Sequence, residues 1–351
     1  MAPSDAAPHP DTQAAQQPWT PSGPTRAPSW QAHLVHWLVA ARMRPHAGRP
    51  IDPPWIRREM GRPRALRRLL ASRSGVHQEE RAQQGGWPGG EYLEARPADG
   101  QPGPTLLYLH GGGYIACSPE THRMLVATLV ARTGGRAWVP RYRLAPEHVY
   151  PAALDDARAA YRYLLDVEQV DPARLVVLGD SAGGGLALAL VQALRDEGHP
   201  LPAAVVAFSP WADLAVTGAS LDENSARCAM FTGDTIRRAA PLYAGPHDPR
   251  TPGVSPLYGD FRGFPPLLVH ASTDEVLRDD AVRVATRAAA QGVRVELRLW
   301  RRVPHVWQFF SAVLPEARES LEAMLTFLRA TGVFPVPDRG MPQAERSSPK
   351  P

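Results

Sequence analysis

The 351-residue sequence has little cysteine, almost no lysine and no long apolar run. Its two cysteines, Cys117 and Cys228, form no C-x-x-C pair, so they build neither a disulfide framework nor a metal site by themselves. No apolar run reaches the roughly 18 residues that a membrane-spanning helix needs. Residues 1–28 also lack the charged start and the apolar stretch of a signal peptide. We therefore expect a cytoplasmic protein without an integral membrane segment.

Because Lys350 is the only lysine, arginine carries nearly all of the positive charge. The 39 basic and 35 acidic side chains give a net charge of +4. Residues 1–80 contain 11 Arg and 6 acidic residues, a sum of +5, which leaves −1 for residues 81–351. An arginine cluster at residues 57–68 offers a site for phosphate groups or an anionic membrane surface. Since base-stacking aromatics do not interleave with it, we expect a solvated helix face and no nucleic-acid partner.

The two ends of the chain differ from its centre in composition. Residues 1–28 consist largely of Ala, Pro, Gln, Ser and Thr, and residues 335–351 have a similar character, so both are predicted to be disordered tails. Apolar residues at helical spacing predict a helix from Trp30 to Arg44. A second, Arg-rich helical segment is predicted from about Pro54 to Arg73.

From Pro104 onward, segments with the apolar pattern of strands alternate with segments of helical spacing. The predicted strands are Thr105–Leu109, Ala137–Pro140, Leu175–Leu178, Ala203–Phe208, Leu267–Ala271 and Val293–Leu299. The predicted helices are His122–Arg132, Ala152–Leu165, Ala182–Arg195, Arg278–Ala290 and Glu316–Leu328. This alternation favours the α/β class, with a mostly parallel sheet covered by helices on both faces. The interval 211–256 is too long for an ordinary loop and predicts an insertion with structure of its own.

The strongest local motif is GDSAG at residues 179–183, between an apolar strand and a predicted helix. In a G-x-S-x-G motif, small flanking residues permit a strained strand-to-helix turn that lifts the serine oxygen above the sheet. The helix N-terminus beneath it favours developing negative charge. For an isolated motif, a glycine-rich turn with an incidental serine is an equal alternative. The strand and helix around the motif make Ser181 the candidate nucleophile.

A second motif, HGGG at residues 110–113, follows the strand Thr105–Leu109. Consecutive glycines let backbone N–H groups converge on one point, which suits the oxyanion of an acyl-transfer reaction. A phosphate loop is the weaker interpretation, because neither G-x-G-x-x-G nor G-K-[ST] is present. We expect an oxyanion hole formed by the N–H groups of Gly112, Gly113 and Ala182.

A catalytic acid and a base should follow the nucleophile in the order Ser, Asp or Glu, His. Asp274 lies just beyond a predicted strand and is the predicted acid, with Glu275 as its near competitor. Asp279 and Asp280 are interpreted as helix-start acids that cap the helix and complement its dipole. Among 12 histidines, only His305 lies beyond Asp274, so it is the predicted base.

Four blocks of sequence together resemble the hormone-sensitive-lipase family of α/β-hydrolases. They are HGGG at 110–113, YRLAPE at 142–147, YPAA at 150–153 and GDSAGG at 179–184, and the resemblance covers about residues 104–330. Two departures are visible. His305 is followed by Val-Trp in place of the commoner x-Phe, and the stretch that begins at Asp274 reads DEVL where D-P-L is common.

The resemblance implies an α/β-hydrolase domain at residues 75–334 and a helical cap built from residues 29–74 and the 211–256 insertion. It also implies that cap side chains line an apolar pocket, with Trp30, Trp37, Trp211, Met230 and Phe231 as candidates. Core packing within the cap is the alternative for each of them. Beside the glycine loop and the predicted base, Tyr114 and Trp307 are further candidates for the walls of the site.

These features predict a serine carboxylester hydrolase that acts on short or medium acyl chains or on lactones through an acyl-enzyme. No metal or organic cofactor is expected, and the expected partner is a small ester. Pairing into dimers through the sheet edge or the last helix occurs in relatives, so the resemblance allows a homodimer and leaves the oligomeric state open. Two alternatives stay open: an amide or N-acetyl hydrolase with the same triad, and a non-catalytic receptor for a small ligand on the same fold.

Overall fold

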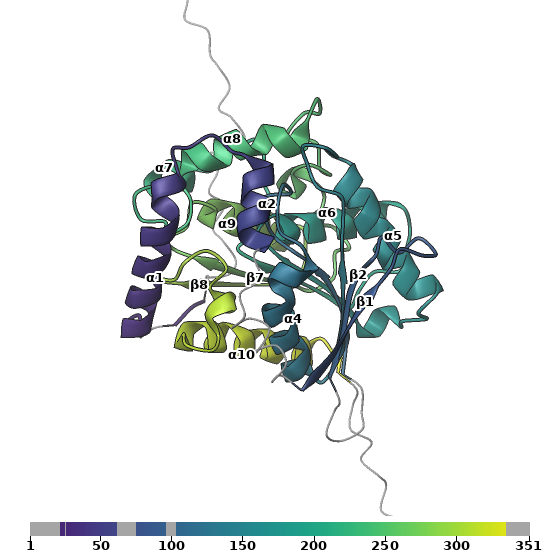
Figure 1. Cartoon of the computed structure of the whole chain (residues 1–351). Coiled ribbons are helices and arrows are strands. Elements are labelled where there is room, and N and C mark those ends of the chain that lie inside the picture. The colour runs from purple at the N-terminus through teal and green to yellow at the C-terminus, as the bar shows by residue number, and fades with distance from the viewer. Residues whose placement is uncertain (1–21, 25, 62–74, 96–102, 335–351) are drawn as a thin grey trace, which may run out of the picture.

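A computed structural model describes residues 22–24, 26–61, 75–95 and 103–334, and a twisted eight-stranded sheet crosses its centre (Figure 1). The strand order is β1-β2-β4-β3-β5-β6-β7-β8. The β1–β2 and β2–β4 pairs are antiparallel and all other pairs are parallel. The strands are β1 Val76–Arg81, β2 Gly90–Ala95, β3 Thr105–Leu109, β4 Arg136–Pro140, β5 Leu175–Asp180, β6 Ala204–Phe208, β7 Leu267–Ser272 and β8 Val295–Trp300.

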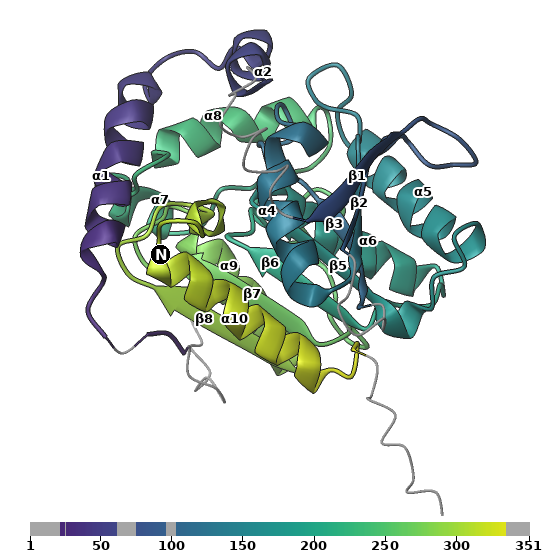
Figure 2. The same ribbon diagram turned by 60° about the horizontal axis from the view of Figure 1, so that its bottom comes forward.

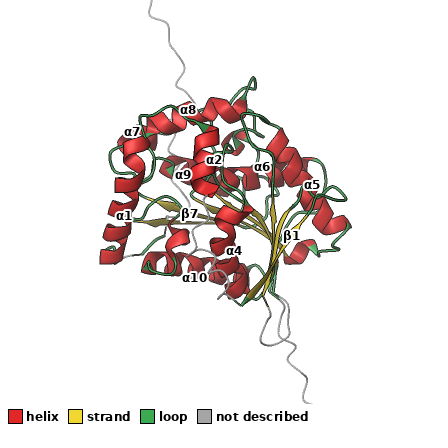
Figure 3. Ribbon diagram, in the orientation of Figure 1, coloured by secondary structure: helices red, strands yellow, loops and turns green. Residues whose placement is uncertain are grey.

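Helices cover both faces of this sheet, as Figure 3 shows in red against the yellow strands. One face packs against α5 (Ala152–Asp166), α6 (Ala182–Asp196) and α9 (Arg278–Ala290), and the other packs against α4 (Pro119–Thr133) and α10 (Pro315–Ala330). Successive residues of a strand point to opposite faces, so Leu106 joins the second core and Leu107 the first. The predicted α/β class and its mostly parallel sheet are confirmed.

The first two strands were not predicted from the sequence. β1 reads VHQEER, which has none of the apolar alternation of a half-buried strand, and it pairs only with β2 at the edge of the sheet. Charged side chains at a sheet edge discourage pairing with another chain. Tertiary pairing therefore decides the conformation of this segment, against its local sequence pattern.

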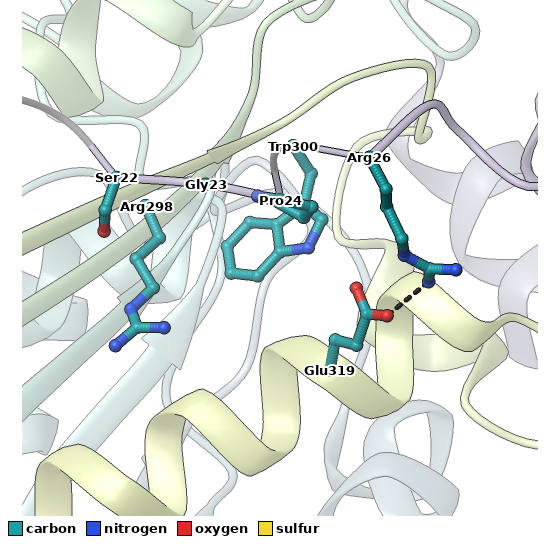
Figure 4. Close-up of a pocket in the computed structure, with 7 residues that line it drawn as sticks. All are labelled: Ser22, Gly23, Pro24, Arg26, Arg298, Trp300 and Glu319. Carbon is teal, nitrogen blue, oxygen red and sulfur yellow. Dashed lines mark hydrogen bonds and ion pairs between the residues drawn. The ribbon is translucent and has the colours of Figure 1, made fainter.

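The described part of the predicted N-terminal tail differs from the prediction. Ser22 pairs with β8, because its N–H donates to the Leu297 carbonyl at 3.0 Å and its carbonyl accepts from Leu299 at 2.8 Å. A Cβ atom on Gly23 would lie 2.1 Å from the Leu299 oxygen, so only glycine allows this close approach. This segment lines one side of a hollow, shown in Figure 4. Trp300 and the ion pair between Arg26 and Glu319 line it as well. Residues 1–21, 62–74 and 335–351 lie outside the described residues.

The cap combines two parts of the chain that are far apart in sequence. Its N-terminal part contains α1 (Trp30–Met43), the short 3-10 helix η2 (Arg44–His46) and α2 (Pro53–Gly61), and the 211–256 interval contains α7 (Ser220–Glu223) and α8 (Gly233–Ala244). Figure 2 shows α8 between α1 and the central sheet. Arg238 on α8 donates to the carbonyl oxygens of Ala47 at 2.6 Å and Arg49 at 2.7 Å. These bonds join the two parts into one cap.

None of the helices in the described residues has the length and apolar character needed to cross a membrane. The longest, α10, has 16 residues.

Candidate active site

Ser181 occupies a strained turn between β5 and α6. Its φ and ψ angles are 54° and −124°, outside the regions that L-residues normally adopt. Its N–H donates to the Phe208 carbonyl at 2.8 Å, and its own carbonyl accepts from Trp211 at 2.9 Å. These bonds to the end of the adjacent strand β6 hold the turn, as expected for a nucleophile elbow.

The glycine after this turn permits close packing below it. A Cβ atom on Gly183 would lie 2.0 Å from the Leu109 carbonyl oxygen and 2.4 Å from that of His110. The first turn of α6 therefore rests directly on the end of β3, where the HGGG turn begins. This contact brings the two motifs of the sequence together.

The HGGG turn presents unused backbone donors. Gly112 has a φ of 121°, and a Cβ atom there would lie 2.2 Å from the Ala116 carbonyl oxygen, so this position requires glycine. Within the described parts of the chain, the N–H groups of Gly112, Gly113 and Ala182 donate no hydrogen bond to the protein. Ala182 is the first residue of α6, where an N–H has no partner inside the helix. These three donors are the predicted oxyanion hole.

A buried carboxylate supports this turn. Asp180 accepts hydrogen bonds from the Tyr108 hydroxyl at 2.6 Å and from the Gly111 N–H at 3.1 Å, and His122 Nε2 lies 3.2 Å from its Oδ1. Burial opposes ionisation, but the charge and hydrogen bond of His122 and the Tyr108 hydroxyl outweigh it and lower the pKa of Asp180. A substitution here would leave buried donors without a partner. The GDSAG motif by itself predicted no role for this aspartate.

The histidine of HGGG is structural in this arrangement. The His110 ring stacks on Tyr142 at a centroid distance of 4.2 Å, and the Tyr142 hydroxyl donates to the His110 carbonyl at 2.6 Å. Burial, helped by the nearby His122, lowers the pKa of His110 to about 3, so its ring is neutral at physiological pH. His110 thus joins the HGGG and YRLAPE blocks.

The prediction of Asp274 as the catalytic acid is wrong. His305 Nδ1 lies 2.5 Å from Glu275 Oε2, whereas the Asp274 carboxylate accepts from the N–H of Arg302 at 3.0 Å. The turn after β7 sends adjacent side chains in different directions. Glu275 points inward and is 1% exposed, and Asp274 points toward the loop that carries Arg302.

The second oxygen of Glu275 is also fully engaged. Glu275 Oε1 accepts from the Ser272 N–H at 2.7 Å and from the Ser209 hydroxyl at 3.0 Å. The Asn224 side chain in the cap insertion donates to the Glu275 carbonyl at 2.8 Å. Three donors on its two oxygens hold this buried carboxylate in a fixed position.

His305 is buried and has one free ring nitrogen. Because Nδ1 bonds to Glu275, the lone pair of the neutral ring lies on Nε2, which has no hydrogen-bond partner among the described residues. Phe231 of the cap covers the ring at a centroid distance of 5.3 Å. The N–H of Val306, the residue after His305, donates to Ser209 Oγ at 3.4 Å. Phe208, whose carbonyl accepts from Ser181, directly precedes Ser209, so these bonds join the elbow and the loop of the base through the end of β6.

Asp279 and Asp280 lie in the first turn of α9 as predicted, yet their carboxylates bind the insertion. Asp280 accepts from the N–H groups of Ala212 and Asp213, both at 2.8 Å, and Asp279 accepts from that of Ser220 at 2.8 Å. Burial, reinforced by the neighbouring Asp213, raises the pKa of Asp280 well above its usual range. These bonds anchor the start of the insertion to the catalytic domain.

The candidate pocket residues divide into two groups. The Tyr114 ring stacks on that of Tyr243 at a centroid distance of 3.6 Å, and the centroid of the Trp211 ring lies 6.1 Å from that of Tyr114. The predicted residues Tyr114 and Trp211 thus lie beside the oxyanion turn. Trp307 instead packs in a separate core with Trp300 and donates its indole N–H to the Glu316 carbonyl at 3.1 Å. Its prediction as a wall of the site is wrong.

The prediction that Trp30 and Trp37 of the cap line the pocket is also wrong. The side chains of Trp30 and Trp37 are 70% and 63% exposed, so they face solvent and line no pocket. They lie on the face of α1 opposite the buried residues Ala32 and Val35. The periodicity of this helix carried no information on which apolar face would be buried.

Arg57 fixes the cap to the oxyanion turn, a contact that the sequence analysis missed. Its guanidinium donates to the carbonyl oxygens of Ile115 and Ala145, both at 2.7 Å, and pairs with Glu147 at 2.7 Å. The N–H of Ile115 in turn donates to the Gly112 carbonyl at 3.1 Å. The prediction of a solvated helix face is therefore wrong for Arg57.

Comparison with known proteins agrees with this geometry. Residues 106–309 match the family profile described as alpha/beta hydrolase fold. The chain is 48% identical to an acetyl-hydrolase of Streptomyces hygroscopicus over 238 residues, which are 68% of this chain and 79% of that protein. It is 34% identical to an esterase of Acinetobacter venetianus over 242 residues, 68% of this chain and 78% of that one.

The comparison with solved structures extends over more of the chain. A crystal structure of an esterase from the bacterial hormone-sensitive lipase family matches with a TM-score of 0.77 and 37% identity, over 87% of this chain and 99% of that one. The chain belongs to the hormone-sensitive lipase family of α/β-hydrolases. It is a carboxylester hydrolase.

Proposed function

We propose that the protein cleaves esters of short acyl chains through a covalent acyl-enzyme on Ser181. The single observation that supports this mechanism best is the bond between His305 Nδ1 and Glu275, which leaves Nε2 of a buried histidine without a partner. Nε2 is the atom that accepts the serine proton in a Ser-His-acid triad.

The reaction proceeds in two halves. His305 takes the proton of Ser181 as its oxygen attacks the ester carbonyl, and Glu275 stabilises the imidazolium that forms. The N–H groups of Gly112, Gly113 and Ala182 hold the oxyanion of the tetrahedral intermediate. His305 then protonates the leaving alcohol oxygen, and the ester bond breaks. In the second half, His305 takes a proton from water as its oxygen attacks the acyl-enzyme, and it returns this proton to the Ser181 oxygen as the acyl–serine bond breaks and the carboxylic acid leaves.

A small acyl group suits the surroundings of the oxyanion turn. The rings of Tyr114, Tyr243 and Trp211 fill the space beside it and are at most 2% exposed. Long acyl chains would have to displace these packed rings, at a cost that cores do not readily accept. The name of the Streptomyces relative, acetyl-hydrolase, agrees with a small acyl group.

Cleavage of an N-acetyl or other amide bond is the second candidate, because it uses the same triad and the same oxyanion donors. It needs protonation of a leaving nitrogen, which His305 Nε2 is equally able to supply. The two candidates are separated by measuring kcat/KM for matched acetyl ester and acetyl amide substrates. We expect the ester to react faster, and faster turnover of the amide would reverse the assignment.

The nucleophile is tested with Ser181→Ala and p-nitrophenyl acetate and butyrate. We expect the variant to lose at least about 10⁴-fold in kcat, with an unchanged circular dichroism spectrum. Wild-type protein should turn over acetate and butyrate and lose activity as the acyl chain lengthens. Substantial turnover by Ser181→Ala would reject Ser181 as nucleophile, and a wild-type protein inactive on every ester and amide would favour the receptor.

A further inference from the structure

The helix α1 has an apolar face that no described residue covers. Nine large apolar side chains are exposed in the described part of the chain, and four of them lie on this helix: Trp30, Leu34, Trp37 and Leu38. Their spacing of four, three and one residues places them on one side, opposite the buried Ala32 and Val35. We call these four residues the α1 stripe. Figures 1 and 2 both show α1 at the outer edge of the molecule, with no other element on its outer side.

Contiguous apolar surface of this kind usually marks an interaction site. Two more of the nine exposed apolar side chains, Trp55 and Met60, belong to α2 in the same part of the cap. Six of nine thus fall within residues 30–60, although this range is less than a tenth of the sequence.

The charge around the stripe indicates the nature of the partner. No acidic residue lies on α1, and residues 30–61 contain five arginines against Asp52 and Glu59. Among the described residues, Arg44 donates to the carbonyl oxygens of Ser225 and Ala226 and pairs with no carboxylate. A helix with exposed Trp and Leu on one side and arginines nearby resembles the segments that lie in the plane of an anionic membrane surface. Tryptophan in particular favours the level of the lipid headgroups.

We propose that the α1 stripe docks the enzyme on an anionic phospholipid surface. The four apolar side chains enter the boundary between headgroups and acyl chains, and the arginines of the cap bind the phosphates. This binding would bring the cap to a place where apolar esters concentrate. The proposal does not depend on the identity of the ester that the site cleaves.

The test is co-sedimentation of the full chain with vesicles of phosphatidylglycerol and phosphatidylcholine at equal parts. Trp37→Ser combined with Leu38→Gln should lower the bound fraction at least about tenfold, because both side chains lie in the stripe. Val167→Ser is the matched control: this side chain is 55% exposed but ends α5, outside the cap, and its loss should leave binding unchanged. Vesicles of phosphatidylcholine alone should bind less protein, and 0.5 M salt should weaken binding to the mixed vesicles.

Hydrolysis of soluble p-nitrophenyl acetate is measured in parallel and should be equal in all of these proteins. This readout reports folding and the catalytic site separately from docking. Equal vesicle binding by the double variant and the wild type, or no binding of wild type to the anionic vesicles, would overturn the proposal. Self-association that the double variant abolishes, seen by light scattering without lipid, would instead assign the stripe to a second copy of the chain and would also overturn it.

Discussion

Aromatic side chains are buried at the catalytic edge of the sheet and exposed on cap helix α1. At the catalytic edge, Tyr108 and Tyr142 are buried, and their hydroxyls have buried partners. On cap helix α1, Trp30 and Trp37 are exposed over most of their surface. The first region is closed and immobilises polar groups for chemistry, whereas the second is open and leaves apolar surface exposed.

The two regions also differ in how their charges are compensated. Buried carboxylates such as Asp180, Glu275 and Asp280 each accept at least two hydrogen bonds, so none is left unsatisfied in the interior. The cap instead carries an excess of arginine. Arg57 is where the two regions meet, because this cap residue binds the carbonyl oxygens behind the oxyanion turn.

The largest effect is expected at the catalytic edge, from the two adjacent acids. Glu275→Gln should lower kcat for p-nitrophenyl butyrate by about 10⁴, as when the acid of a Ser-His-Asp triad is replaced by its amide. Asp274→Asn is the control and should change kcat by less than about tenfold, because its carboxylate bonds to Arg302 and not to the base. A larger loss for Asp274→Asn would return the role to that residue.

The next effect concerns the oxyanion turn. Gly112→Ala places a Cβ atom against the Ala116 carbonyl and should move the N–H donors, lowering kcat about 10²- to 10³-fold. Gly198→Ala is a matched control, since Gly198 also has a positive φ, of 73°, but nothing lies near its Cβ position. Gly198→Ala should lose about 1 kcal/mol of stability from backbone strain and keep its activity, whereas Gly112→Ala should lose more stability, because its Cβ also clashes with a backbone oxygen, and should lose activity. Equal kcat losses would mean that strain alone is responsible.

A smaller effect is expected where the cap meets the turn. Arg57→Gln removes two bonds to backbone carbonyls and should lower kcat about tenfold with little change in KM, because the donors shift while the pocket remains. Arg58→Gln tests the neighbouring arginine on the same helix, which is exposed, and should leave kcat unchanged. If KM changes and kcat does not, Arg57 acts on the cap and not on the turn.

The smallest effect is on stability in acid. The hydrogen bond from Arg57 lowers the pKa of Glu147 from 4.5 to about 2. A carboxyl group whose pKa is lowered by folding stabilises the fold when the pH is above its pKa in the unfolded chain. This contribution is lost as the pH falls from 4.5 to about 2. At this half-exposed site the loss is less than about 1 kcal/mol. The unfolding temperature of the wild type should therefore fall more steeply over this pH range than that of Arg57→Gln. Parallel falls in the two proteins would show that the Arg57–Glu147 pair does not contribute to stability.

The sequence predicted most of the parallel core, because its strands and helices carry strong apolar patterns and the motifs lie at their junctions. Six strands and five helices from Thr105 onward were predicted within a few residues. The two antiparallel strands β1 and β2 were missed, since their conformation depends on pairing: β1 is largely charged, and β2, GEYLEA, is short and has no regular apolar alternation. The binding of Ser22 to β8 was missed for the same reason.

Within the site, the motifs predicted one candidate nucleophile and one set of oxyanion donors, but they left two candidates for the acid. Asp274 and Glu275 are neighbours and both carboxylates, so only the direction of the turn after β7 separates them. The Ser272 N–H and the Ser209 hydroxyl that hold Glu275 come from two different strand ends. The contacts of Arg57 with the oxyanion turn could not be predicted, because its partners there are backbone carbonyl oxygens, which every residue has.

The central claim is that Glu275 and His305 activate Ser181, and the rate of labelling by a fluorophosphonate tests it most directly. Intact mass and peptide mapping should show one adduct, on Ser181, in the wild type. The labelling rate should fall by orders of magnitude in Glu275→Gln and stay near the wild-type rate in Asp274→Asn. An adduct on another residue, or equal labelling rates in Glu275→Gln and wild type, would contradict the account.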